Sequence, residues 1–127
     1  MERVLKSSVV HVAFGFVMMG GWALFANRDH GLAGAWLPAL VQGTISGVLT
    51  GILKKTLERL DGTLSGVLAF IAPPLLTATS ILALLTLAHT LIGTPEIVAT
   101  IAVPWSVSTL YAIVYNAGLV RARRRAA

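Results

Sequence analysis

The chain has 127 residues, of which 56% are hydrophobic and only 12% are charged. Soluble domains carry about 25% charged residues, so this composition, with a mean hydropathy of +0.82, indicates a membrane protein and leaves no room for a separate soluble domain. The formal net charge is +5, but the basic residues flank apolar stretches, which argues against nucleic-acid binding. The absence of cysteine excludes disulfides, thiolate metal ligands and a thiol nucleophile.

Four apolar stretches cover residues 8–26, 32–53, 64–92 and 97–120. Each is close to or above the roughly 20 residues that a helix needs to cross the hydrocarbon core of a bilayer. The connections between them are short, which favours antiparallel neighbours. The sequence therefore predicts an all-α, polytopic membrane protein, in which residues 1–127 form one transmembrane domain of four helices in an up-down-up-down bundle.

The basic residues gather at alternate ends of these stretches. They flank the start of the first stretch, the connection between the second and third, and the end of the fourth: Arg3, Lys6, Lys54, Lys55, Arg59, Arg121, Arg123, Arg124 and Arg125. The other two connections hold only Arg28. By the positive-inside rule both chain ends are predicted to be cytoplasmic. The Ala- and Gly-rich composition is typical of bacteria, so we predict a multi-pass protein of the bacterial inner (plasma) membrane whose basic residues contact lipid headgroups.

The first stretch follows a short basic segment, as the core of a signal peptide does. It is longer than such a core and has a poor cleavage pattern near Ala26, so we interpret it as a retained helix. His11 lies a few residues inside its cytoplasmic end. An ionisable residue in a membrane helix is a functional candidate, but one this close to the end also reaches the interface.

The second stretch carries two neighbouring rows of residues at four-residue spacing. One row is glycine and the other polar: Gly43, Gly47 and Gly51 beside Gln42, Ser46 and Thr50. Four residues is just over one helical turn, so each row lies along one face. The glycine face predicts tight helix packing, because association in lipid depends on close backbone approach and interhelical hydrogen bonds. Three interpretations stay open: contact with a helix of the same chain, a homo-oligomer seam, or a wall of a substrate cavity.

The third stretch contains Pro73 and Pro74, which cannot donate hydrogen bonds to the carbonyls of Ala69 and Phe70. Either one tilted helix kinks at the pair, or residues 64–70 form a short interfacial segment and Pro73 opens a new helix. We favour the kink. Backbone groups freed at membrane depth are tolerated only against protein or water. The prolines inside the predicted helices are therefore expected to face the bundle interior: Pro38, Pro73, Pro74 and Pro104.

Several ionisable residues are predicted to share the outer side of the membrane: Arg28, Asp29, His30, His89 and Glu96. Imidazole and carboxylate groups can hold a divalent metal, but no two of these ligands lie three or four residues apart on one helix, so we assign no metal site. A substrate or headgroup site and a structural hydrogen-bond cluster are the remaining interpretations. A haem held by both His11 and His89 is disfavoured because the two lie near opposite faces, and no cofactor is assigned.

We predict a small transporter-like or lipid-handling protein that acts as a homo-oligomer on a neutral or amphipathic substrate. Proline-broken helices and midplane hydroxyls without full charges suit such a substrate. The predicted cavity wall comprises Gln42, Ser46, Thr50, Thr77, Ser80, Ser108 and Tyr111, and the outer polar mouth comprises His30, His89 and Glu96. Predicted partners are membrane lipids and a second copy at the face of Gly43, Gly47 and Gly51.

Two alternatives belong to other classes. The first is a non-catalytic subunit or anchor of a larger membrane complex, which suits the small size of the chain and its lack of motifs. The second is an intramembrane enzyme that uses His89 or His30 with a nearby carboxylate. The chain contains no recognisable catalytic motif, so the sequence disfavours an enzyme.

Overall fold

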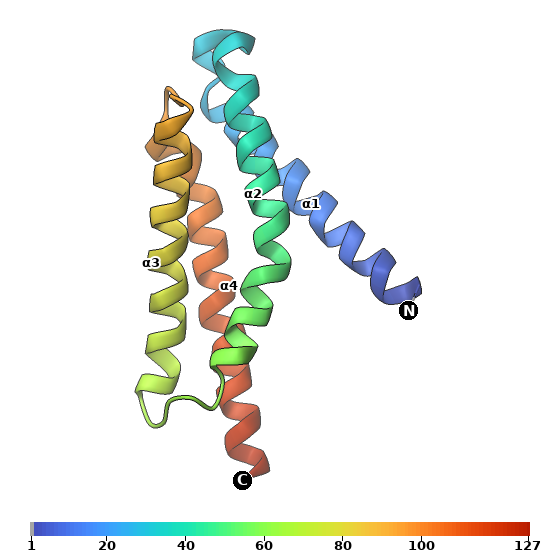
Figure 1. The fold of residues 1–127 in the computed structure, drawn as a ribbon, viewed down its shortest axis with the longest axis vertical. Coiled ribbons are helices and arrows are strands. Elements are labelled where there is room, and N and C mark those ends of the chain that lie inside the picture. The colour runs from blue at the N-terminus through green and yellow to red at the C-terminus, as the bar shows by residue number, and fades with distance from the viewer. Residues whose placement is uncertain (1) are drawn as a thin grey trace.

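The computed structural model describes residues 2–127, except for the side chains of residues 4–6. The described chain is all-helical (Figure 1), with elements α1 (Glu2–Ala26), a short 3-10 turn η1 (Arg28–His30), α2 (Gly31–Leu60), α3 (Leu68–Leu91) and α4 (Ile97–Ala126). Each of the four α-helices is long and apolar enough to cross a membrane. The predicted all-α fold with four helices of membrane-spanning length is confirmed.

Two ends of the molecule are distinguished below. The turn end carries η1 and the α3–α4 connection, and the basic end carries the α2–α3 connection and the C-terminus (Figure 1). Large hydrophobic side chains are exposed on all four helices. A soluble monomer rarely exposes apolar patches larger than a few hundred Å², so these surfaces fit a chain surrounded by lipid. The predicted orientation of the ends across a membrane stays a prediction.

The third helix, α3, begins later than predicted. It begins at Leu68, so residues 64–67 belong to the connection. Within that connection Gly62 and Gly66 have φ of 82° and 63°, a left-handed conformation that glycine adopts without strain. Pro73 and Pro74 lie inside α3 and do not open a new helix. The interpretation in which Pro73 opens a new helix is therefore wrong, whereas the position of residues 64–70 relative to a membrane stays a prediction.

The paired prolines of α3 are compensated by a side chain of α4. The Asn116 amide donates to the carbonyl oxygens of Ala69 at 2.9 Å and Phe70 at 3.2 Å. These are the two carbonyls that lose their helical donors to Pro73 and Pro74. All the prolines within the helices are buried, as predicted: Pro38, Pro73, Pro74 and Pro104.

The hydrophobic core lies among three of the four helices. Its buried members come from α2, α3 and α4: Leu53, Leu57, Ile81, Leu85, Ile101 and Ala112. Among the described residues α1 contributes no side chain to this cluster; its carboxyl-terminal half packs against α2, and Ala23 there is fully buried. Toward its N-terminus α1 diverges from the bundle (Figure 1), and Val9 and Val10 are 66% and 64% exposed.

The glycine face of α2 packs against α1 of the same chain. A Cβ added at Gly43 would lie 2.9 Å from the carbonyl oxygen of Phe16, and one at Gly47 would lie 3.2 Å from a methyl carbon of Val12. Gly20 of α1 approaches α2 equally closely, and its added Cβ would lie 2.9 Å from the Ala39 carbonyl oxygen. The intrachain interpretation of this face is therefore confirmed for Gly43 and Gly47.

The third glycine of the row has a different environment. A Cβ added at Gly51 would meet no described atom within 4 Å. Gly51 is exposed in the single chain, although Gly15 of α1 still lies against the neighbouring Thr50. The prediction that Gly51 packs against a helix therefore stays a prediction. The predicted homo-oligomer seam stays a prediction, and within the chain α1 covers two of its three glycines.

Candidate functional site

The predicted outer cluster separates into a buried group and a surface pair. The buried group centres on His89, which has no exposed surface. Its Nδ1 lies 2.7 Å from the Thr94 hydroxyl and its Nε2 lies 2.9 Å from Gln42 Oε1. The Gln42 amide in turn donates to the Ser46 hydroxyl at 2.9 Å. Because Gln42 Oε1 can only accept, the network assigns the proton to Nε2, and Nδ1 accepts from Thr94.

The surface pair is formed by His30 and Glu96. Their Nε2 and Oε1 atoms are 3.0 Å apart, and the side chains are 42% and 51% exposed. The structure therefore separates the three residues of the predicted polar mouth, because His30 and Glu96 lie at the surface whereas His89 is fully buried. Among the described residues, no group of three or more His, Asp or Glu side chains could hold a metal ion.

Asn27, the residue before η1, links this turn to the start of α4 through hydrogen bonds. Its amide donates to the Thr100 hydroxyl at 2.8 Å and to the Ala23 carbonyl at 2.9 Å, and its Oδ1 accepts from the Glu96 amide at 3.0 Å. Trp22 adds a bond from its indole N–H to the Ala99 carbonyl at 2.8 Å. The turn end is therefore held by hydrogen bonds between helices that are distant in sequence.

Sequence reasoning missed both buried asparagines. Asn27 lies in a polar loop, where its composition indicates only a turn, and Asn116 lies near a predicted interface, where it needs no partner. The signal for Asn116 was available in part, because the two carbonyls freed by the prolines require a donor from another helix. Sequence alone does not identify which side chain supplies that donor.

The predicted cavity residues do not converge on one cavity in the single chain. Gln42 and Ser46 belong to the buried group around His89. Four of the others use their hydroxyls on carbonyl oxygens of their own helices, which leaves no convergent polar lining: Thr50, Thr77, Ser80 and Ser108. The last member, Tyr111, is 39% exposed on α4.

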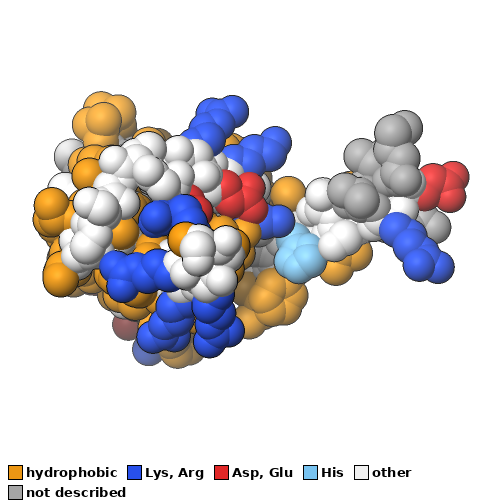
Figure 2. All heavy atoms as spheres, turned by 90° about the horizontal axis from the view of Figure 1, so that it is seen from below, with side chains coloured by type: hydrophobic (Ala, Val, Ile, Leu, Met, Phe, Trp, Pro, Cys, Tyr) orange, Lys and Arg blue, Asp and Glu red, His pale blue; other side chains and the backbone are white. Residues whose placement is uncertain are grey.

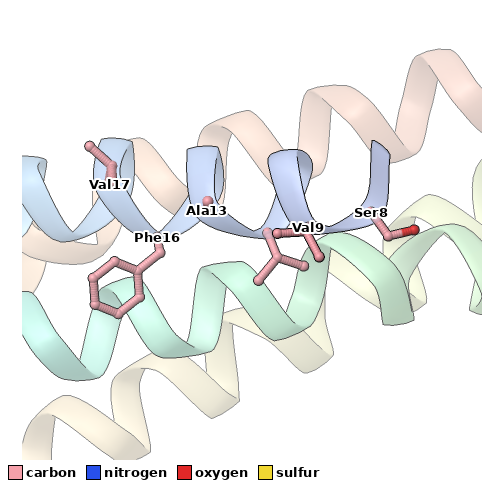
Figure 3. Close-up of a pocket in the computed structure, with 6 residues that line it drawn as sticks. Ser8, Val9, Ala13, Phe16 and Val17 are labelled. Carbon is pink, nitrogen blue, oxygen red and sulfur yellow. The ribbon is translucent and has the colours of Figure 1, made fainter. Parts of the chain in front are cut away.

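Two apolar hollows lie elsewhere on the surface. One, of about 480 Å³, is lined by residues of α1 alone: Ser8, Val9, Val12, Ala13, Phe16 and Val17. Figure 3 shows this part of α1 and labels all of these residues except Val12. The other, of about 340 Å³, follows α4 and is lined by Val107, Leu110, Tyr111, Val114 and Tyr115. The rings of Tyr111 and Tyr115 stack at 5.3 Å between centroids. Both hollows are open and apolar.

The exposure of α4 shows how the second hollow arises. Thr100, Val107 and Val114 follow one another at seven-residue spacing and therefore share a face, which we call the α4 stripe. Thr100 is fully buried beneath Asn27, whereas Val107 and Val114 are 50% and 64% exposed. The stripe is covered at the turn end and opens toward the basic end, where α1 leaves the bundle. We call the hollow along this open part of the stripe the wedge.

The basic end gathers most of the charge. Figure 2 shows Lys and Arg side chains over this end of the bundle, with the N-terminal part of α1 standing apart. The Tyr115 hydroxyl donates to Glu58 at 2.6 Å, and Lys54 lies 3.8 Å from the same oxygen. Arg123 pairs with Asp61 at 3.1 Å. The carboxylates of this end are therefore engaged, and its net charge is positive.

The chain matches no protein-family model, no curated protein and no solved structure. The arguments for function below therefore depend on the geometry of the chain itself.

Proposed function

We propose that this protein is a lipid-handling membrane protein that binds an amphipathic lipid in the wedge along α4. The observation that carries the proposal is the loss of cover along the α4 stripe, from buried Thr100 to Val114 at 64% exposed. The wall that this leaves is apolar and hollowed, which suits an acyl chain.

The distribution of polar groups supports a lipid more than a water-soluble substrate. The strongest candidates for binding a polar solute, Gln42 and His89, have no exposed surface and hydrogen-bond each other. Binding sites for small polar molecules place a few polar groups inside a concave pocket. The hollows of this chain have apolar linings, and most of the charged side chains lie at the basic end.

One observation favours a second candidate, a subunit that docks onto another polypeptide or a second copy. Gly51 continues the glycine row that α1 already uses at Gly43 and Gly47, yet it is uncovered among the described residues. Small residues allow close helix approach in lipid. A second helix at Gly51 would extend an existing interface.

Photo-crosslinking tests the first candidate. We would reconstitute the protein with phospholipid that carries a diazirine in its acyl chain and map the modified residues by mass spectrometry. The matched reference is the outer face of α3, where Ile71 and Leu75 are 54% and 62% exposed. Trp105 bonds to Ala78 and Asn116 to Ala69, so residues 107–114 of α4 lie at the same depth as these references.

We expect labelling of Val107 and Val114 to exceed that of Ile71 and Leu75 severalfold, because a bound lipid stays longer than a bulk lipid. We also expect Val114→Trp to reduce the lipid that co-purifies with the protein, whereas Leu75→Trp leaves it unchanged. Equal labelling of the two faces would contradict the proposal. Protection of the α4 stripe from lipid, with crosslinks to another chain, would favour the docking candidate.

A further inference from the structure

The α4 stripe does not end in apolar residues. Arg121 follows Val114 at seven residues, and Arg125 follows Arg121 at four, so both arginines lie on the same face of α4. Both are exposed. On the basis of the proposed lipid-handling function, we propose that the wedge selects an anionic phospholipid whose phosphate binds Arg121 and Arg125.

Neither arginine takes part in an ion pair or side-chain hydrogen bond found among the described residues. Asp61 pairs with Arg123, and Glu58 is engaged by Tyr115 and Lys54. Arg124 donates to the Gly66 carbonyl at 2.9 Å and lies over the Phe70 ring. Arg121 and Arg125 are thus the guanidinium groups at the foot of the stripe that remain available for an external anion.

The chemistry and the dimensions agree with a lipid headgroup. A guanidinium presents a planar fork of donors that matches phosphate oxygens. Residues 114 and 121 are seven apart, or about 10 Å along the helix axis, which is within one leaflet of a bilayer whose hydrocarbon core is about 30 Å thick. A lipid with its phosphate at Arg121 therefore places its acyl chains beside Val114, and Val107, about 21 Å from Arg121 along the axis, lies at the level of the acyl-chain ends.

Native mass spectrometry of the full chain in mild detergent tests this inference, with phosphatidylglycerol and phosphatidylcholine of identical acyl chains as the titrated lipids. We expect the chain to prefer phosphatidylglycerol. We expect R121Q/R125Q to lose about five-fold in this preference for each arginine, since a basic residue near the surface contributes about 1 kcal/mol. Phosphatidylcholine binding should remain unchanged.

The matched control is K55Q/R59Q, which removes the same charge from exposed positions of α2 at the same end. We expect it to keep most of the preference. An equal loss in both double variants would show a general surface field and overturn the inference. R121K/R125K should retain part of the preference, because it keeps the charge and loses the fork.

The two proposals fail in different ways. Labelling of Val107 and Val114 by the photoactivatable lipid without any preference for phosphatidylglycerol would overturn this inference and leave the proposed function standing. Absence of labelling at the stripe would overturn the proposed function itself. All the substituted residues are exposed, and an unchanged elution volume in size-exclusion chromatography would confirm that the variants fold.

Discussion

The two halves of α1 have opposite relations to the rest of the molecule. The carboxyl-terminal half touches α2 through Gly20 and α4 through Trp22, and its Ala23 is fully buried. The amino-terminal half carries polar and charged residues between its apolar ones, and Val9 and Val10 are mostly exposed. Large apolar side chains are exposed in the carboxyl-terminal half as well, so hydrophobicity alone does not decide which residues pack.

The difference follows from what holds helices together in lipid. Lipid tails are as apolar as the side chains, so helix association depends on close backbone approach and interhelical hydrogen bonds. The carboxyl-terminal half of α1 has both, through Gly20 and through the indole of Trp22. Among the described residues, His11 bonds only within its own helix, to the Ser7 carbonyl. With no such bond between helices there, α1 is free to diverge.

The largest expected change in stability comes from a substitution that pushes the packed half of α1 away from α2. In Gly43→Val the added Cβ would meet a backbone carbonyl at 2.9 Å, which cannot rotate away as a side chain does. Overpacking of this kind lowers the free energy of unfolding by about 1–3 kcal/mol, and we expect a loss in the upper part of this range. Steric-trap unfolding in bicelles measures this loss. Gly51→Val is the matched control and should stay near wild type, and similar losses in both variants would refute the assigned packing.

The next effect concerns the hydrogen bonds of the turn end. Asn27→Ala removes the acceptor of the Glu96 amide and the donor to the Thr100 hydroxyl. Each buried polar group left unpaired lowers the free energy of unfolding by about 1–3 kcal/mol before the structure relaxes. We therefore expect Asn27→Ala to lower the free energy of unfolding by about 2 kcal/mol in total. Hydrogen–deuterium exchange should accelerate at residues 96–100. Asp29→Ala, at an exposed neighbouring position, should change neither stability nor exchange.

A smaller effect is expected within the buried group. His89→Leu leaves Gln42 Oε1 and the Thr94 hydroxyl without partners. Interhelical polar pairs in membranes average about 0.6 kcal/mol and reach about 1.7. A double-mutant cycle with Gln42→Leu should give a coupling energy in this range. Zero coupling would show that the two side chains are neighbours without an energetic link, and a loss of lipid binding in either single variant would revive the predicted role in substrate binding.

The smallest effect is expected at the exposed pair of the turn end. His30→Ala removes the contact with Glu96, in which both side chains are about half exposed. Exposed ion pairs contribute about 0–1 kcal/mol, so unfolding should change by less than about 0.5 kcal/mol. The same unfolding assay measures this. A loss comparable to that of Asn27→Ala would show that the surface pair, and not the buried asparagine, holds α1 to α4.

The sequence by itself determined the class of the molecule, because apolar runs near 20 residues satisfy their own backbone groups as helices and no other open structure does so in lipid. It also predicted which prolines are buried and that the glycine face of α2 is a contact. The glycine pattern could not identify the partner, since Gly43, Gly47 and Gly51 are equivalent in sequence and only α1 distinguishes them.

Only the tertiary structure decided where the packing ends. Asn27, Asn116 and His89 find donors and acceptors 46 to 73 residues away, and no local pattern encodes such pairings. The wedge depends on which part of α4 is covered, since Thr100 lies beneath Asn27 and Val114 is open. Helix formation depends on local sequence and can be predicted from it. Which helices pack together in lipid depends on a few polar and small-residue contacts, and these are seen only in the assembled bundle.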